Sequence, residues 1–352
     1  MFQLKKKILL LFFLCSFLPG LFAQQEVSTV YLVGDAGEDT IPGKALLLLK
    51  DELLGHPNST VVFLGDNVYP SGLVTQSRRS CAHLESQLQI LKEYKGRIYF
   101  VPGNHDWDAQ RRNGLAALKC QQMYVEDYLK SNSAAANKNE HPFLPINGLP
   151  GPETVMLNGH LRLIALDTQW FLHYYKKNKN GSKKQTKELF YSRFDSLLNY
   201  ASQHKEQVLV TAHHPMYTNG EHARRLQPLR FLINYTPLQV FGLMGLNRLL
   251  TQDLSQPRYK KMRKKMLRSL DKYDNIIYAS GHDHNLQYFK EKGNGYIVSG
   301  CGSKRSHLRK QKRFEPVFED DQHTGFVKLE YGTEGKVKIS IYRPGLAPLL
   351  VQ

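Results

Sequence analysis

Residues 60–69, TVVFLGDNVY, join a short apolar run to a glycine, an aspartate and a tyrosine. A run of β-branched and aromatic residues predicts a buried β-strand, and the glycine lets the chain turn sharply where the strand ends. In open α/β sheets, sites assemble at the carboxyl ends of the strands. The stretch therefore predicts a strand that delivers Asp66 and Tyr69 to a site.

Four further apolar runs end in the same way. They lead into Gly34-Asp35-Ala36-Gly37, Gly103-Asn104-His105-Asp106, Thr211-Ala212-His213-His214 and Gly281-His282-Asp283-His284. A single aspartate or histidine after a strand is more often a turn residue or a packed side chain than a ligand. Five such segments favour a site, because the structural explanation would have to hold independently for each of them.

Together the five segments supply a complete set of metal donors. Two carboxylates, one phenol, one amide and three imidazoles suit two adjacent six-coordinate ions, with positions left for water and substrate. Hard oxygen donors favour a trivalent or otherwise hard ion, and imidazoles suit zinc or iron.

Apolar runs alternate with helix-like stretches, which indicates an α/β fold. The expected strands are 29–33, 60–64, 97–101, 161–166, 207–211 and 275–279, and the expected helices are 43–54, 77–94, 114–130 and 184–204. Later strands at 295–299, 325–331 and 336–342 lack long helices between them and look like a meander that closes a second sheet. We therefore expect one catalytic domain with a two-sheet core and helices outside.

The composition bounds the class of protein. Of the 352 residues, 41% are hydrophobic, which excludes a disordered chain. The formal net charge of +17 indicates an anionic partner, which could be a phosphate ester, a nucleic acid or an acidic membrane surface.

Residues 1–23 resemble a cleaved secretory signal peptide. Lys5, Lys6 and Lys7 precede an apolar core, 8–18, that is too short to span a bilayer. We expect a secreted or periplasmic protein whose single catalytic domain is 24–352. Loss of the three lysines lowers the charge from +17 to +14. A lipoprotein anchor at Cys15 is disfavoured, because bulky residues precede that cysteine.

The five segments resemble the metallophosphoesterase superfamily and, within it, the purple acid phosphatases. The pattern of that family is Asp-x-Gly, Gly-Asp-x-x-Tyr, Gly-Asn-His-Asp/Glu, Val-x-x-His and Gly-His-x-His, in this order. Gly37 stands where the wider superfamily usually carries a histidine, and Tyr69 is present. The sequence 281–300 looks like the small, tartrate-resistant type. The resemblance covers about 30–302 and implies a four-layer α/β/β/α sandwich, in which two mixed sheets are flanked by helices.

The resemblance also implies which residues bind two metal ions. The first ion, expected to be Fe(III), would be bound by Asp35, Tyr69 and His284. The second, a divalent Fe, Zn or Mn, would be bound by Asn104, His213 and His282, and Asp66 would bridge both. A phenol titrates near ~10, so its binding as phenolate at lower pH needs a strongly acidic ion such as Fe(III), which would colour the protein.

The catalytic roles follow from the same resemblance. The metals would clamp the phosphate, and a metal-bound hydroxide would attack phosphorus. His105 would contact the phosphate and help protonate the leaving group, and Asp106 would orient His105. His222 would also face the substrate, with a surface-loop position as the alternative. We expect His214 to pack against the site and Asp167 to support it.

The expected function is therefore that of a secreted acid phosphatase acting on phosphate monoesters. A phosphodiesterase or pyrophosphatase would use the same metals with a different pocket. The alternative from another class is a non-catalytic binder of anionic glycolipid or nucleic acid, although the intact donor set argues against it. We expect no specific nucleic-acid partner.

Some segments lie outside the five motifs. An apolar insertion at about 224–258 fits a lid, a helical excursion packed on the domain, or a hairpin that rests on a membrane through 224–268. Basic stretches at 174–187, 258–268 and 304–313 fit solvated faces, the first and third as loops and the second as a helix. Cys81 and Cys120 fit either a disulfide or two free thiols. Asn58 and Asn180 match the glycosylation pattern.

Overall fold

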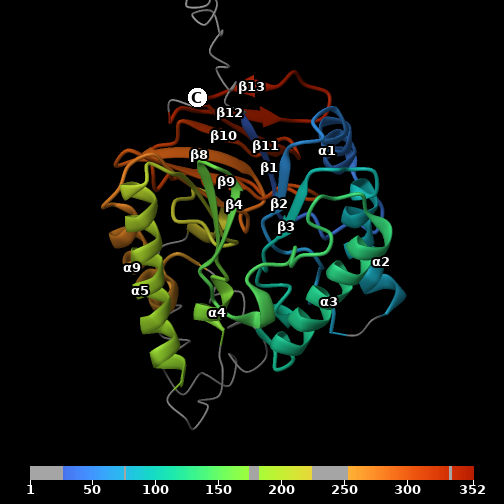
Figure 1. Cartoon of the computed structure of the whole chain (residues 1–352), viewed down its shortest axis with the longest axis horizontal. Coiled ribbons are helices and arrows are strands. Elements are labelled where there is room, and N and C mark those ends of the chain that lie inside the picture. The colour runs from blue at the N-terminus through green and yellow to red at the C-terminus, as the bar shows by residue number, and fades with distance from the viewer. Residues whose placement is uncertain (1–26, 75–76, 174–181, 224–252, 333–334) are drawn as a thin grey trace, which may run out of the picture.

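The computed structural model describes residues 27–74, 77–173, 182–223, 253–332 and 335–352. Two β-sheets pack face to face, and helices cover the outer face of each (Figure 1). This is the four-layer α/β/β/α arrangement expected from the sequence. The expected signal peptide at 1–23 and most of the insertion, 224–252, lie outside the described residues.

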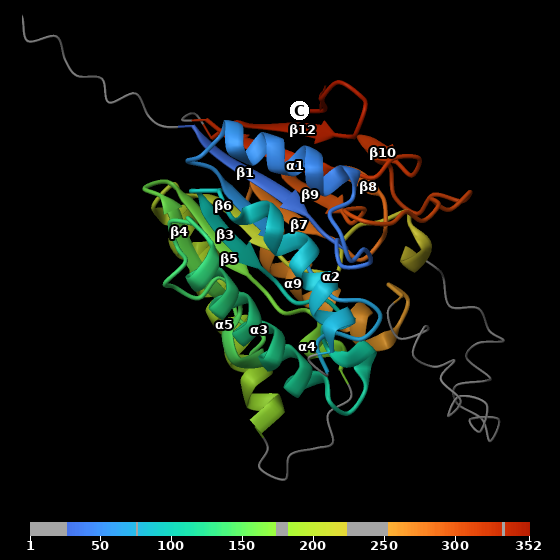
Figure 2. The same cartoon turned by 90° about the vertical axis from the view of Figure 1, so that its right-hand side faces the viewer.

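The first sheet is built on three parallel strands with an antiparallel extension. Its order is β13 (Leu349–Leu350), β12 (Val337–Tyr342), β11 (Phe326–Tyr331), β1 (Ser28–Val33), β2 (Thr60–Phe63) and β3 (Arg97–Phe100). The helices α1 (Lys44–Gly55) and α2 (Arg78–Leu88) connect the three parallel strands, and the short 3-10 helix η1 (Gln89–Leu91) follows α2. With α3 (Gly114–Asn132), α1 and α2 cover the side of the molecule that faces the viewer in Figure 2.

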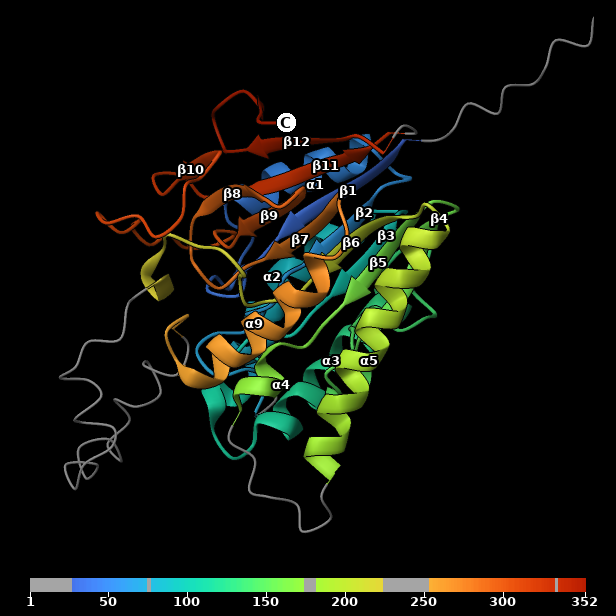
Figure 3. The same ribbon diagram turned by 90° about the vertical axis from the view of Figure 1, so that its left-hand side faces the viewer.

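The second sheet has four parallel strands in its centre and antiparallel strands at both edges. Its order is β10 (Phe318–Asp320), β8 (Leu286–Glu291), β9 (Asn294–Ser299), β7 (Ile276–Ser280), β6 (Gln207–Thr211), β5 (Leu161–Ala165) and β4 (Glu153–Asn158). The helices α4 (Gln169–Leu172), α5 (Ser182–Gln203) and α9 (Pro257–Leu270) lie on its outer side (Figure 3).

The strand pattern creates two apolar layers. In β1, Val30 and Leu32 belong to the cluster between the sheets, whereas Tyr31 and Val33 belong to the cluster beneath the helices. The same alternation occurs in β2 and β3, because successive side chains of a strand point to opposite faces. Each fully buried Val or Leu contributes about 1.5–3 kcal/mol, so both layers stabilise the edge at which the strands end.

Two expectations about the fold are corrected. The late strands do not form one meander: β9 lies in the second sheet, whereas β11 and β12 extend the first. The reason is that β11 pairs antiparallel with β1, whose edge is otherwise open. Part of the expected lysine-rich loop, 182–187, is the start of α5. Lys183 and Lys187 lie over the rings of Trp170 and Phe171, so this stretch gains packing as a helix.

The other expected segments can be compared directly. The stretch 258–268 lies within α9, and 304–313 is irregular, as the sequence predicts. Cys81 and Cys120 are not joined in a disulfide, and Cys301 is buried. Among the described residues, no helix is both long and apolar enough to cross a bilayer.

Candidate metal centre

The two sheets end at a common cluster of polar side chains. Asp35 and Asp66 follow β1 and β2 of the first sheet, and His213 follows β6 of the second. All three are buried, and their ligand atoms lie within 4.8 Å of one another. Because buried charges must be paired or coordinate a metal, this cluster is the candidate metal centre.

Glycines allow the loops of the two sheets to meet. A Cβ atom on Gly37 would lie 2.2 Å from the carbonyl carbon and oxygen of Asn67, and one on Gly103 would lie 2.2 Å from Oδ1 of Asp66. Asp35 and Asp66 themselves have positive φ angles, 56° and 55°. Such backbone strain costs about 1–3 kcal/mol for each residue and concentrates at functional sites. The motif glycines are therefore needed for close approach of backbones.

The first half of the centre is rich in oxygen. The hydroxyl of Tyr69 lies 2.9 Å from Oδ1 of Asp35 and 3.0 Å from Oδ2 of Asp66, and Nε2 of His284 lies 3.2 Å from the hydroxyl oxygen. Burial, together with both carboxylates, raises the pKa of Tyr69 well above its usual value. A hard cation among these oxygens would oppose that effect, because an opposite charge favours the phenolate. The donor set fits such an ion.

The second half is rich in imidazole. Oδ1 of Asn104 lies 3.0 Å from Nε2 of His213 and 3.0 Å from Nδ1 of His282. Nδ1 of His213 lies 2.9 Å from the carbonyl oxygen of Leu64, which suits an Nδ1–H donor and leaves a lone pair on Nε2. That lone pair then faces the oxygen of Asn104, so a cation fits between them. A second contact that fixes the ring is the usual arrangement for a metal-binding histidine.

Asp66 joins the two halves. Its Oδ2 lies 3.0 Å from the Tyr69 hydroxyl and 3.4 Å from Nε2 of His213. Burial disfavours the charged form of Asp66, but His213 and His105 nevertheless hold its pKa well below the usual value. Burial also lowers the pKa of His213, but Asp66 raises it to about 9. The position of Asp66 fits the bridging role expected from the sequence.

His105 lies at the edge of the centre. Its backbone N–H donates to Oδ1 of Asp66 at 2.8 Å, and its ring packs against that of Tyr69, with ring centroids 4.4 Å apart. Nδ1 lies 2.5 Å from the carbonyl oxygen of Pro70, while Nε2 lies 3.9 Å from Oδ2 of Asp66. The side chain is 30% exposed, so Nε2 can reach a bound molecule.

The prediction that Asp106 orients the His105 ring is not supported by the side-chain hydrogen bonds, because Nδ1 of His105 lies against the carbonyl oxygen of Pro70 and the Asp106 carboxylate bonds to other groups. The carboxylate of Asp106 accepts from the backbone N–H groups of Asn67, Val68 and Gly103 and from the side chains of Asn67 and Gln121. Complete burial, with Asp66 nearby, raises the pKa of Asp106 to about 6. Asp106 therefore clamps two metal-site loops together, and Pro70 holds the His105 ring.

His222 lies beside the imidazole half and not on a distant surface loop. Its ring stacks on that of His282, with centroids 4.0 Å apart, and its backbone N–H donates to Oδ1 of Asp283. Nδ1 lies 3.2 Å from Oδ1 of Asp253. Burial lowers the pKa of His222, but Asp253 and Asp283 raise it overall. Sequence reasoning missed Asp253, because no motif surrounds it and the contact spans 31 positions.

His214 and Asp167 support the centre from outside. Nδ1 of His214 lies 2.8 Å from Oγ1 of Thr168, and its ring packs edge-on against Tyr259. Asp167 accepts from Nε1 of Trp107 and from the backbone N–H of Trp170, and burial raises its pKa to about 7. The His214 ring also packs against the rings of His282 and His213, with centroids 4.5 Å and 5.1 Å apart, so the geometry of His214 and Asp167 suits packing and support.

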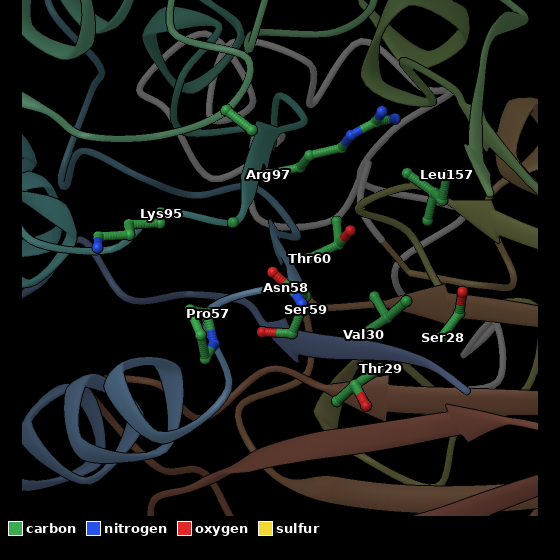
Figure 4. Close-up of a pocket in the computed structure, with 12 residues that line it drawn as sticks. Ser28, Thr29, Val30, Pro57, Asn58, Ser59, Thr60, Lys95, Arg97 and Leu157 are labelled. Carbon is green, nitrogen blue, oxygen red and sulfur yellow. The ribbon is translucent and has the colours of Figure 1, made fainter. Parts of the chain in front are cut away.

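A separate cavity lies at the opposite edge of the first sheet. It has a volume of about 180 Å³ and is lined by the residues at the starts of β1, β2 and β3 (Figure 4). Lys95 and Arg97 extend from it in opposite directions, and Arg97 donates to the carbonyl oxygen of Met156. The two cations do not converge, so this cavity does not provide a second anion site.

The sequence profile of the calcineurin-like phosphoesterases matches residues 29–286, about three quarters of the chain. The chain belongs to this family. The matched range contains every residue of the candidate metal centre, from Asp35 to His284. It excludes the last strands of the first sheet, β11 to β13, and the basic loop at 304–313.

Parts of the chain are similar in sequence to tartrate-resistant acid phosphatases. The chain is 36% identical over 75 residues to tartrate-resistant acid phosphatase type 5 of Oryctolagus cuniculus, covering 21% of each chain. It is 27% identical over 135 residues to the enzyme of the same name from Homo sapiens, covering 38% of this chain and 29% of the relative. The chain thus matches less than a third of the length of these relatives.

Several solved structures have a similar fold. A purple acid phosphatase from yellow lupin seeds superposes with a TM-score of 0.53 at 16% identity, over 91% of this chain and 52% of the other. A dimetal phosphatase from Danio rerio gives 0.50 at 14% identity, over 92% and 98%. GAP50, described as the anchor in the inner membrane complex of Plasmodium, gives 0.53 at 15% identity, over 92% and 88%.

Proposed function

We propose that this phosphoesterase is a secreted acid phosphatase that hydrolyses phosphate monoesters with two metal ions. The observation that carries the proposal is the pair of donor clusters joined by Asp66. One cluster contains Asp35, Tyr69 and His284, and the other contains Asn104, His213 and His282. The partial match to tartrate-resistant acid phosphatases supports the choice of activity.

The donor chemistry supports different ions in the two halves. We assign Fe(III) to the oxygen-rich half, since a phenolate ligand needs a strongly acidic ion. A divalent Fe, Zn or Mn suits the half with two imidazoles. When bound, such a pair polarises the phosphate ester and activates water.

The side chains of His105, His222 and Asp253 contribute to the proposed chemistry. Nε2 of His105, at the exposed edge, can donate a proton to the leaving-group oxygen, while the carbonyl oxygen of Pro70 holds Nδ1. His222 faces the bound ester from the opposite half, and Asp253 holds its ring.

A non-catalytic binder is the second candidate function. A protein with a similar fold, GAP50, is described as the anchor in the inner membrane complex of Plasmodium. The complete set of seven metal-type ligands favours an enzyme, because a binding role would not require all of them. Fold similarity alone does not choose between these functions.

The experiment that tests the proposal combines elemental analysis with a substrate panel. The purified chain is assayed at pH 5 and pH 7 with phosphomonoesters, a diester, pyrophosphate, nucleotides and a phosphoprotein. Asp66→Ala removes the expected bridging ligand. The surface variant Asp195→Ala is its matched control. The proposal is supported if the wild-type chain and Asp195→Ala hydrolyse monoesters and Asp66→Ala does not. Absence of turnover in the metal-loaded wild-type chain overturns the proposal. A preference for the diester or for pyrophosphate shows that phosphate monoesters are not the preferred substrate class.

We further propose that α9 makes peripheral contact with anionic surfaces. Tyr259, Met262, Met266 and Leu270 of this helix are buried in the core, so its apolar side is not available for insertion. Its sequence carries seven basic residues and no acidic ones. Co-sedimentation with vesicles that contain 30% phosphatidylserine tests the contact. Binding that is lost in a Lys260→Glu/Lys264→Glu variant supports it, and equal binding to neutral vesicles contradicts it.

Secretion is tested by the mature N-terminus. The sequence supports cleavage after Ala23, so the protein recovered outside the cytoplasm should begin at Gln24. Recovery of a chain that still carries residues 1–23 would contradict the proposal.

A further inference from the structure

A lysine outside the family motifs lies directly against the candidate metal centre. Nζ of Lys304 is 3.3 Å from the centre of the Tyr69 ring and 2.9 Å from Oε2 of Glu38. Its side chain is 28% exposed, so the ammonium group is partly covered but remains reachable from solvent.

The loop that carries Lys304 is tied to the metal centre on both sides of this residue. The N–H of Gly302 donates to the carbonyl oxygen of Gly34, and Oγ of Ser303 donates to the carbonyl oxygen of Asp35 at 2.5 Å. The N–H of Ser306 donates to the carbonyl oxygen of His284 at 2.7 Å. Lys304 is therefore anchored next to two of the expected metal ligands and differs from an ordinary surface lysine.

Glu38 fixes the direction in which the lysine points. Its backbone N–H donates to Oγ of Ser303, and its carboxylate pairs with the Lys304 ammonium. Burial opposes the charged form of Glu38, but Lys304 lowers its pKa below the usual value, and His105 adds to this effect. The ring of Tyr69 contacts both Nζ of Lys304, at 3.3 Å from the ring centre, and the ring of His105, with centroids 4.4 Å apart, so Lys304 and His105 are neighbours of the same expected metal ligand.

The ammonium group keeps hydrogen-bonding capacity for a ligand. A lysine has three N–H donors, and the Glu38 carboxylate uses one of them. A phosphate ester whose leaving group is protonated by His105 would place that leaving group near the Tyr69 ring, which Lys304 also contacts. A second negative charge on the leaving group would meet Lys304 there.

We propose that Lys304 is a specificity-determining residue that selects phosphate monoesters whose leaving group carries a second anionic group, either a carboxylate or a further phosphate. The inference rests on the proposed phosphatase function and deepens it by naming the substrate class. Lys304 binds the distal anion, and the metal donors and His105 carry out the chemistry of the reacting phosphate.

The test compares two esters that differ in one charge. 4-Carboxyphenyl phosphate and 4-carbamoylphenyl phosphate have similar size and similar leaving groups, but only the first carries a second anion. The ratio of their kcat/KM values is measured for the wild-type chain, Lys304→Met and the exposed control Lys310→Met from the same loop. We expect the ratio to fall about fivefold in Lys304→Met, as for the loss of one partly exposed ion pair, and to be unchanged in Lys310→Met.

Three further measurements separate the outcomes. 4-Carboxyphenyl phosphate is replaced by 1,4-phenylene bisphosphate, whose leaving group carries a second phosphate, to distinguish a phosphate from a carboxylate as the distal group. Lys304→Arg should retain the ratio, and added salt should lower it in the wild-type chain. Equal losses for both aryl esters in Lys304→Met, or a ratio insensitive to salt in the wild-type chain, would overturn the inference and leave Lys304 as a support for Tyr69. No turnover of either ester by the metal-loaded wild-type chain would instead refute the proposed function.

Discussion

Replacement of Gly37 by alanine should disable the metal centre while leaving the fold in place. Gly37 belongs to the loop that follows β1 and lies against the loop that follows β2. Its N–H donates to the carbonyl oxygen of Asp66, and its carbonyl oxygen accepts from the backbone N–H of Tyr69. An added Cβ would lie 2.2 Å from the carbonyl atoms of Asn67 and 2.6 Å from the nitrogen of Val68. All of these atoms belong to the backbone, so no side-chain rotation can relieve the contact.

The size of the effect follows from that distance. Ordinary carbon contacts need about 3.5 Å, so the two loops must separate by about 1 Å. Overpacking of this kind costs about 1–3 kcal/mol of unfolding free energy. Misplacement of catalytic groups by about 1 Å lowers the rate about 100-fold. Because Asp35 and Asp66 lie on the two loops that must separate, we expect loss of metal together with loss of activity.

Gly159→Ala provides a matched control, since an added Cβ there meets nothing within 4 Å. Both variants are compared by metal content, kcat/KM and the midpoint of urea unfolding. Gly37→Ala should lose about 100-fold in kcat/KM at the wild-type metal supply, whereas Gly159→Ala should match the wild type. A Gly37→Ala protein with full metal content and normal kcat/KM would refute the reasoning.

Three further predictions concern single side chains. His105→Ala should lower turnover about 100-fold with both metals retained, because the ring acts on the leaving group, and loss of metal from this variant would contradict that position. Tyr69→Phe should abolish the visible absorption band of a concentrated iron-loaded sample, whereas a band that persists would remove the phenolate from the site. His173→Gln should flatten the acid limb of the stability profile: burial, Lys183 and Arg258 lower the pKa of His173 to about 4, so the unfolded chain binds the extra proton first. His173 should therefore account for about 2 kcal/mol of the fall in unfolding free energy between pH 6.5 and pH 4, so that urea unfolding shows a smaller fall in this variant than in the wild type; identical slopes would rule out this role for His173.

Much of the centre could be predicted from the sequence because its chemistry is local. Each expected ligand follows the end of a strand within a few residues, and the apolar runs identify those strands. The structure accordingly places ligand atoms of Asp35, Asp66 and His213 within 4.8 Å of one another. The alternation of Val30, Tyr31, Leu32 and Val33 also indicates a strand that is buried on both faces.

Features that depend on long-range pairing could not be predicted in the same way. The strand β11 joins the first sheet because it finds the open edge of β1, which lies almost 300 residues earlier in the chain. The partner of His222 is Asp253, at the far end of the insertion. Asp106 appeared to be a catalytic partner because it follows His105, but its carboxylate turns toward the backbone of the neighbouring loop. Sequence proximity does not show the direction of a side chain.

The central claim is that Asp66 joins two metal ions in one phosphoesterase site. Its most direct test is the metal content per chain of the purified wild-type protein and of Asp66→Ala, measured with phosphomonoesterase activity on the same samples. We expect two ions per chain with activity in the wild type, and loss of both metal and activity in Asp66→Ala. An active wild-type protein with fewer than two ions, or an Asp66→Ala protein that keeps both, would contradict the account.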